Sequence, residues 1–237
     1  MRNIVFCLFL FSNICIQSAD NDINQILDSF VQAETNEEIN RQLSLLQEKL
    51  LKIKDVSCDV NVLNKKTGIC LLHYALGRGY KRLFVEACDK KCADFNVYEQ
   101  GSTGKKPFLY WLVRQPDGFV KLALKSGADP ELKDADGQNA LHIASFCGKT
   151  EICRMFLTNY KMPVNETSNY GATPLHCASY LAHTETIALL LKHGARKNVQ
   201  DYMLEAFPID FLHIGFDALS DNSPISKRFA QAIALLK

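Results

Sequence analysis

Three histidines recur along this 237-residue chain, and histidine is the side chain most often used for proton transfer and metal binding. His142 and His176 each follow a leucine directly, and His73 follows a leucine in a similar segment. A zinc ion holds its ligand atoms about 2 Å away, so several histidines must converge on one point. A single histidine in each repeating segment instead spaces the rings one repeat apart. The spacing therefore predicts structural histidines and no metal site.

Other patterns that could support catalysis are weak. Residues 101–105 (Gly-Ser-Thr-Gly-Lys) lack the spacing of a phosphate-binding loop, and we expect an ordinary loop there. The sequence has no Gly-x-Ser-x-Gly motif of the kind that presents a nucleophilic serine. Asp117 and Glu131 are interpreted as surface carboxylates. We therefore predict a protein that is not an enzyme and that binds no cofactor.

The chain has nine cysteines, of which Cys7 and Cys15 fall in the first 19 residues. The number that remains is odd, so at least one thiol is free even if the others pair. Cys88 and Cys92 are the candidates for a local disulfide, whereas cysteines at repeat positions, such as Cys177, favour packed thiols. None of the spacings is typical of a zinc site.

The histidine segments belong to a longer unit that recurs with a period of about 33 residues. Residues 173–178 (Thr-Pro-Leu-His-Cys-Ala) parallel residues 139–144 (Asn-Ala-Leu-His-Ile-Ala), and residues 122–129 parallel 189–196. A threonine followed by a proline, as at 173–174, is typical of the start of a helix. The glycines within residues 122–129 and 189–196 are typical of the end of a second helix. One unit is therefore predicted to be a helix, a short turn, a second helix and a projecting loop. Such a unit buries its apolar face only by stacking on others.

With Thr-Pro-Leu-His-x-Ala at this period, the chain resembles the ankyrin-repeat family. The resemblance covers about five units, of which the last is irregular. It implies an all-α, ankyrin-type solenoid of stacked helix-turn-helix repeats with helical caps. It also implies that the motif histidine bonds backbone and the threonine of its own motif. In function, it implies binding through loop tips and through inner helices that line a concave face.

The first 19 residues (1–19) are predicted to be a secretory signal peptide. Arg2 precedes an apolar run from Ile4 to Ile16, which is followed by Ser18 and Ala19. The run is short for a membrane span. We therefore expect an exported protein, secreted or periplasmic, with cleavage after Ser18 or Ala19. An uncleaved membrane anchor or a buried N-terminal helix is the alternative.

Residues 20–57 are predicted to form an N-terminal helical cap that precedes an ankyrin repeat domain at 58–237. Apolar residues from Ile39 to Ile53 alternate at intervals of four and three, which is typical of one helix face. Thr35 and Glu38 have the spacing of a capping box for that helix. The alternative is a coiled-coil partner helix, for which the pattern is too short.

The charge balance argues against nucleic acid as the partner. The formal net charge of the chain is +1. It becomes 0 if the leader is removed, because Arg2 is the only charged residue before Asp20. A neutral protein lacks the basic surface that binds nucleic acid or an acidic membrane. We predict a monomer whose partner is another protein, with no membrane contact beyond the signal peptide.

In this resemblance, the contact positions lie beside the unit glycine and at the end of the first helix. In the last three units these positions carry large apolar residues, which commonly anchor protein interfaces. The predicted partner-binding residues are Phe146, Tyr170, Tyr180, Leu181, Met203, Leu204 and Ile214. We expect Phe146, Tyr170 and Tyr180 to form one contiguous exposed patch. For Leu204 and Ile214, packing beneath the irregular last repeat is the alternative.

The sequence therefore predicts a module that binds a partner protein through the concave face and loop tips of its repeats. The alternative function is a stoichiometric inhibitor or structural accessory of an envelope or extracellular enzyme.

Overall fold

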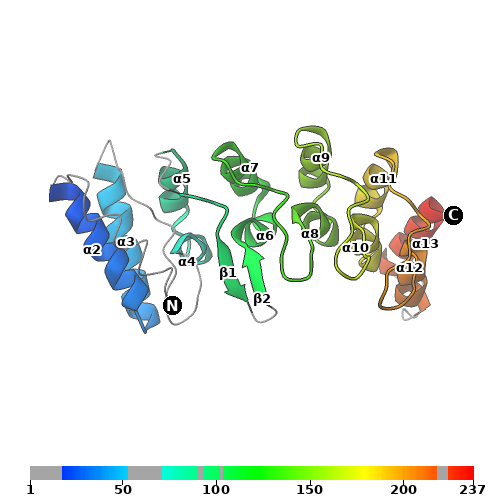
Figure 1. Cartoon of the computed structure of the whole chain (residues 1–237), viewed down its shortest axis with the longest axis horizontal. Coiled ribbons are helices and arrows are strands. Elements are labelled where there is room, and N and C mark those ends of the chain that lie inside the picture. The colour runs from blue at the N-terminus through cyan, green and yellow to red at the C-terminus, as the bar shows by residue number, and fades with distance from the viewer. Residues whose placement is uncertain (1–17, 53–70, 90–92, 102–103, 218–223) are drawn as a thin grey trace. The chain divides into compact units, whose positions relative to one another are not determined.

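The computed structural model of the chain describes residues 18–52, 71–89, 93–101, 104–217 and 224–237 (Figure 1). The chain divides into two compact units, Met1–Ala93 and Asp94–Lys237, which we call unit 1 and unit 2. The predicted signal sequence and the predicted boundary between residues 57 and 58 lie outside the described residues, and both stay predictions. In the described part of the chain, no helix has the length and apolar character needed to cross a membrane.

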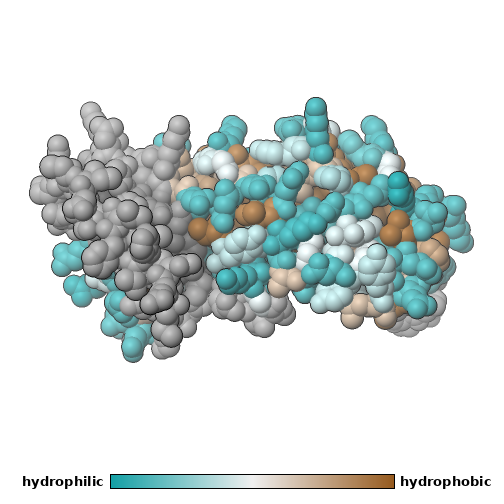
Figure 2. All heavy atoms as spheres, in the orientation of Figure 1, coloured by the Kyte–Doolittle hydropathy of each residue, from teal (hydrophilic) through white to brown (hydrophobic). Residues whose placement is uncertain are grey.

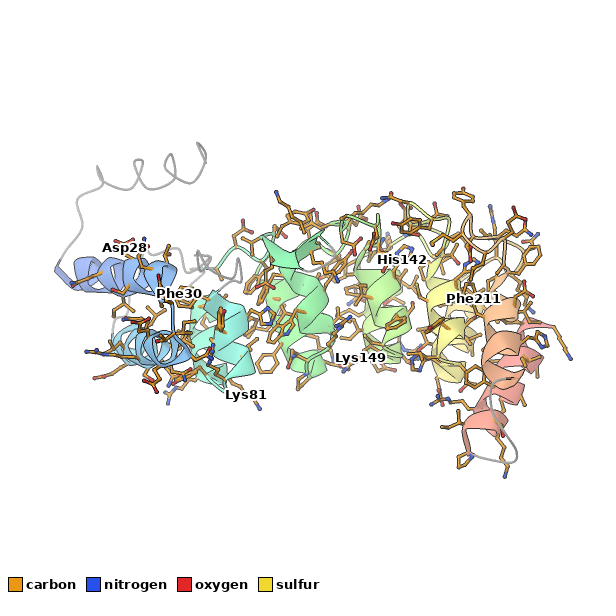
Figure 3. All side chains as sticks on the ribbon, turned by 90° about the horizontal axis from the view of Figure 1, so that it is seen from below. Asp28, Phe30, Lys81, His142, Lys149 and Phe211 are labelled. Atoms are coloured by element: carbon orange, nitrogen blue, oxygen red, sulfur yellow. The ribbon has the colours of Figure 1, made fainter. Side chains whose placement is uncertain are left out.

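Unit 1 consists of four helices in its described part. They are α2 (Ser18–Gln32), α3 (Asn36–Lys52), α4 (Leu71–Gly77) and α5 (Lys81–Asp89). The predicted capping box at the start of α3 is present: the backbone N–H of Glu38 donates to Thr35 Oγ1 (3.2 Å), and the N–H of Thr35 donates to Glu38 Oε2 (3.0 Å). Phe30 of α2, labelled in Figure 3, is fully buried with its ring edge-on to Tyr74 of α4 at 5.8 Å. The two N-terminal helices thus share a core with the first helical pair.

Unit 2 is a stack of helical pairs that follow one another in chain order (Figure 1). The pairs are α6 (Phe108–Val113) with α7 (Asp117–Lys125), α8 (Ala140–Phe146) with α9 (Thr150–Thr158), α10 (Pro174–Tyr180) with α11 (Thr184–Lys192), and α12 (Pro208–Asp217) with α13 (Pro224–Leu236). The first helices pack in sequence, α6 on α8, α8 on α10 and α10 on α12. The second helices also pack in sequence, α9 on α11 and α11 on α13. This arrangement confirms the predicted all-α solenoid.

The loop before α6 forms a short hairpin that the repeat pattern did not predict. Strands β1 (Tyr98–Gly101) and β2 (Gly104–Pro107) pair antiparallel, with Tyr98 opposite Pro107 and Gly101 opposite Gly104. The later loops are joined to one another by single backbone bonds. The N–H of Asn169 donates to the carbonyl of Asp136 (2.9 Å), and the N–H of Tyr202 donates to that of Tyr170 (2.7 Å). Successive loops are therefore fastened to each other.

Helix ends in unit 2 follow the predicted chemistry. Thr173 and Pro174 begin α10, and Gly127 and Gly194 follow α7 and α11 with φ of +98° and +86°. This left-handed backbone is the conformation that favours glycine at a helix end. Because equivalent helices end at the same position of each repeat, the last residues of these helices occupy equivalent positions in successive repeats.

The motif histidines have a structural role, as predicted. The backbone N–H of Thr173 donates to Nδ1 of His176 (3.0 Å), and the Thr173 hydroxyl lies 2.9 Å from the same nitrogen. Nε2 of His176 lies 3.3 Å from the carbonyl oxygen of Ala206, in the next repeat, and donates to it. His142 makes the equivalent bond to the carbonyl of Ala172 (3.2 Å). Burial lowers the pKa of His142 to about 4, so the ring is neutral and bridges two repeats.

Two loop asparagines form a second bridge between repeats. Asn165 Nδ2 donates to the carbonyl of Gly194 (3.0 Å), and Asn165 Oδ1 accepts from the N–H of Arg196 (2.8 Å). Asn96 makes the same pair of bonds two repeats earlier, to the backbone at 127 and 129. Each amide therefore holds the loop that follows the second helix of the next pair.

The cysteines of unit 2 are packed thiols. Cys147, Cys153 and Cys177 form no disulfide. Burial raises the pKa of both Cys153 and Cys177 to about 12, so both are neutral thiols at physiological pH. Cys92 lies outside the described residues, and its bridge to Cys88 stays a prediction.

Candidate binding surface

A row of aromatic side chains crosses three consecutive first helices of unit 2. Phe146 ends α8 and Tyr180 ends α10, so the repeat places them one above the other. Their rings stack with centroids 6.0 Å apart and an interplanar angle of 27°. The Tyr180 ring also lies 6.2 Å from Phe211 of α12. We call Phe146, Tyr180 and Phe211 the aromatic row.

The aromatic row faces solvent. Phe146 is 37% exposed and Tyr180 is 56% exposed, although each touches another ring. Figure 3 labels Phe211 on α12 and His142 on α8, at two ends of the same set of first helices. Tyrosine and phenylalanine at a fixed spacing on rigid helices offer a large contact area at little cost in side-chain entropy.

The residues directly before and after Phe146 and Tyr180 in the sequence carry no charge. The helix positions around it are held by Ile143, Cys147, Cys177 and Leu181. Leu181 is 37% exposed. Arg114 occupies the position of Cys147 one repeat earlier, and Asp210 directly precedes Phe211 on α12. Depletion of charge around exposed aromatic residues is typical of the centre of a protein interface.

A second exposed group lies at the tip of the last loop. Tyr202, Met203 and Leu204 are 75%, 70% and 62% exposed. The turn that presents them is held by the buried carboxylate of Asp201, whose Oδ1 accepts from the N–H groups of Met203 (2.9 Å) and Leu204 (2.7 Å). The N–H of Asp201 also donates to the carbonyl of Ala206 (3.0 Å). Three apolar side chains therefore stand in water on a turn that is already folded.

Tyr170, from the preceding loop, joins this group. It is 42% exposed, and its hydroxyl donates to Asp136 Oδ1 (3.2 Å). The charge of Asp136 raises the pKa of Tyr170. The Tyr202 ring lies against Gly171, where a Cβ atom would come within 3.1 Å of three ring atoms. We call Tyr170, Tyr202, Met203, Leu204 and Asp136 the tip surface.

The structure exposes every predicted binding residue whose side chain it describes. The alternative of a packed Leu204 is wrong, because this residue is 62% exposed. The side chain of Ile214 lies outside the described part, and its role stays a prediction.

That Phe146, Tyr170 and Tyr180 form one patch stays a prediction: the contacts of Tyr170 are with the loop tips, and those of Tyr180 are with Phe146 and Phe211. Tyr170 precedes α10 and Tyr180 ends it, and this helix has seven residues. At about 1.5 Å per residue, the helix separates the two tyrosines by about 10 Å. Tyr170 therefore belongs with the loop tips, while Tyr180 belongs with Phe146.

Two residues of these surfaces were missed by sequence reasoning. Tyr202 lies three residues before the unit position Glu205, an offset that the expected contact pattern skips. Phe211 lies in the middle of its helix, at the position of Ile143 and Cys177, which the pattern does not count as contacts. The aromatic type of both residues was the available signal.

Charged and polar residues cover most of the face drawn in Figure 2, where hydrophobic surface is broken into small patches. Within the described ranges, no group of three or more histidine, cysteine, aspartate or glutamate side chains is placed to hold a metal ion. The exposed aromatic and apolar residues are therefore the features of unit 2 that most need an explanation.

Comparison with known proteins places the repeats in a family. Residues 109–201 match the family described as ankyrin repeats, in three copies. Over 68 residues the chain is 38% identical to "Palmitoyltransferase AKR1" from Mortierella alpina and to "Probable protein S-acyltransferase 23" from Arabidopsis thaliana. Over 128 residues it is 30% identical to the human "Transient receptor potential cation channel subfamily A member 1".

These matches cover small parts of the relatives. The two acyltransferase matches span 29% of this chain but 12% and 13% of the relatives, and the channel match spans 53% of this chain and 11% of the relative. Similarity over so short a part of each relative concerns a shared segment. It does not extend to the activity of the whole protein.

Proposed function

We propose that this chain, which is an ankyrin-repeat protein, binds a partner protein through the aromatic row and the tip surface. Ankyrin repeats are protein-interaction modules, and the proposal names the surface that this one uses. The observation that carries it is the aromatic row, because three rings are in contact across three repeats and two of them, Phe146 and Tyr180, remain exposed to solvent. Soluble proteins seldom keep such a cluster uncovered without a use. We propose binding without catalysis.

Tyr180 is the expected anchor of the interface. It is the most exposed ring of the row and contacts the rings on both sides, so a partner that covers it also covers Phe146. Truncating an anchor of this kind commonly costs 2 kcal/mol or more, which is about a 30-fold loss of affinity. Tyr180→Ala should therefore weaken binding strongly and leave the fold in place.

Affinity purification with matched variants tests the proposal. The parent chain, Tyr180→Ala and Lys121→Ala serve as baits, since Lys121 is exposed on the second helix α7, away from the row. A partner should be retained by the parent and by Lys121→Ala and lost from Tyr180→Ala. If every retained protein is also retained by Tyr180→Ala, the row is not the binding surface. If the partner is an enzyme, titrating it with the chain shows whether binding is inhibitory.

We also propose that the chain is exported. The support is the sequence of its first 19 residues, in which Arg2, an apolar run and Ser18-Ala19 follow in the order of a signal peptide. Mass spectrometry of the extracellular and envelope fractions should find a chain that begins near Asp20. An intact Met1 on protein from the cytoplasmic fraction would contradict export.

A further inference from the structure

We infer that the tip surface binds an arginine side chain of the partner, next to an apolar residue that occupies the aromatic row. The inference rests on the proposed function, because it names the chemistry of the partner segment at the same surfaces. It follows from three features of the loop tips: two open tyrosine rings, one carboxylate, and the absence of a cation between them.

The rings come from consecutive loops that are fastened together. Tyr170 and Tyr202 are joined through the backbone, where the Tyr202 N–H donates to the Tyr170 carbonyl (2.7 Å). Tyr202 is fixed by contact with Gly171, and Tyr170 is fixed by its hydroxyl bond to Asp136. Both ring faces remain partly in water, at 42% and 75% exposure. A flat side chain can stack on either ring without moving the loops.

The carboxylate beside the rings has no cationic partner. One oxygen of Asp136 accepts from Tyr170, and among the described residues Asp136 takes part in no ion pair. Lys133, three residues before Asp136, is paired with Glu166, and the charge of Lys106 on β2 acts on Asp134. The second exposed acid of the tips, Glu205, follows Leu204 directly. The tip surface is therefore aromatic and acidic.

Arginine is the side chain that fits this combination. Its planar guanidinium is weakly hydrated, stacks on aromatic faces and binds a carboxylate through two parallel N–H donors. A lysine ammonium can pair with the carboxylate, but it has no planar group to stack on the tyrosine rings. An acidic partner segment would meet Asp136 and Glu205 with like charge.

The spacing between the two surfaces determines how far apart the arginine and the apolar residue lie in the partner segment. The aromatic row is separated from the tip surface by the length of α10, about 10 Å. An extended peptide covers about 3.3 Å per residue, so an arginine at the tips and an apolar residue at Tyr180 are at least three positions apart. Because the residues next to Tyr180 in the sequence carry no charge, an aromatic or branched aliphatic residue fits there.

Selection from a phage-displayed library of random 12-residue peptides on the full chain tests this inference. Enriched peptides should contain an arginine at least three residues from an aromatic or branched aliphatic residue. A synthetic peptide of the most enriched sequence is then measured by fluorescence anisotropy. Replacing its arginine with lysine or alanine should weaken binding about three- to tenfold or more.

Variants of the chain test whether the arginine of the peptide binds at the tip surface. Asp136→Asn and Tyr202→Leu should each weaken the peptide about three- to tenfold, and neither should weaken further the peptide whose arginine is already alanine. Glu151→Gln removes a charge from the exposed start of α9 and should leave affinity unchanged. Unchanged thermal unfolding confirms that each variant is folded.

Two results would overturn the inference. Enriched peptides that lack arginine, or whose affinity is the same for Asp136→Asn, reject the arginine site; if they are still lost on Tyr180→Ala, the proposed function stands. A selection that enriches no peptide also rejects the inference, and the proposed function is then judged by the affinity purification alone.

Discussion

Substitutions at and near Asn165 can separate the structural role of its amide from its role as a glycosylation acceptor. Asn165 is the first residue of the sequon Asn165-Glu166-Thr167, yet both atoms of its amide are engaged with backbone at Gly194 and Arg196. Replacing it with glutamine adds one methylene, so the amide can no longer hold both short contacts. Replacing Thr167 with alanine destroys the same sequon but leaves the amide in place.

The expected loss follows from the two bonds. A typical hydrogen bond contributes about 0.5–1.5 kcal/mol net, so the pair is worth about 1–3 kcal/mol. Asn165 is only half-buried, and water can replace part of this loss. We therefore expect Asn165→Gln to lower the free energy of unfolding by about 1–2 kcal/mol, or to lower Tm by about 2–8 °C. Thr167 is exposed, and its alanine variant should stay within about 0.5 kcal/mol of the parent.

Urea unfolding followed by circular dichroism measures both variants, with protein produced in a host that does not glycosylate. Asn96→Gln is the matched control, because Asn96 makes the same two bonds to 127 and 129 and is followed by Val97-Tyr98, which is no sequon. It should lose about as much stability as Asn165→Gln.

The reasoning is refuted if Asn165→Gln unfolds at the same urea concentration as the parent. It is also refuted if Thr167→Ala loses as much as Asn165→Gln, because the amide bonds would then not explain the loss.

Three further predictions concern stability. Among the described residues, the buried hydroxyl of Ser179 has no hydrogen-bond partner, and alanine there should raise the unfolding free energy by about 0.5–2 kcal/mol in a urea titration. Ser145→Ala should bring no such gain, since its hydroxyl contacts Cys153 Sγ at 3.7 Å. Leu175→Ala should cost about 2–5 kcal/mol because the side chain is fully buried, whereas Tyr170→Ala should cost about 0.5 kcal/mol; equal losses would contradict the assigned repeat register. His142 has its pKa lowered by burial from 6.5 to about 4, so the unfolded chain takes up the proton first. The contribution of the neutral ring is thus complete above pH 6.5 and is lost as the pH falls toward 4. The urea midpoint should drop across that window, and a His142→Gln variant that drops just as steeply would show that another group is responsible.

The repeat period identified most of the fold because it reports which residues are equivalent. His142 and His176 stand at equivalent positions, and the structure gives both the same bonds. The start of α10 at Thr173 and Pro174 also followed from local chemistry that needs no distant partner. Features of this kind are set within one repeat and can be read from it.

Features that depend on neighbours were not predictable in this way. Ser145 and Ser179 are equivalent residues, but the position eight residues later is Cys153 in one repeat and Ile187 in the next. In the part of the chain that the structure describes, the Ser145 hydroxyl therefore has a partner and the Ser179 hydroxyl has none. The contacts of the exposed tyrosines have the same origin. Tyr170 bonds Asp136 of the preceding loop and Tyr180 stacks on Phe146 of the preceding helix, because each partner is supplied by the neighbouring repeat.

The histidine bonds of unit 2 also show where the chain can be cut. The rings of His142 and His176 each donate to a carbonyl in the following repeat, so each of these two repeats depends on the one after it. The recognisable repeat sequence ends at residue 201, but the acceptor of His176 is Ala206, and the Phe211 ring lies edge-on to His176 at 5.8 Å. A fragment trimmed to the matched residues would leave a buried ring nitrogen without its acceptor and would remove the third ring of the aromatic row. A fragment that keeps these contacts must therefore extend one irregular repeat beyond the matched residues 109–201.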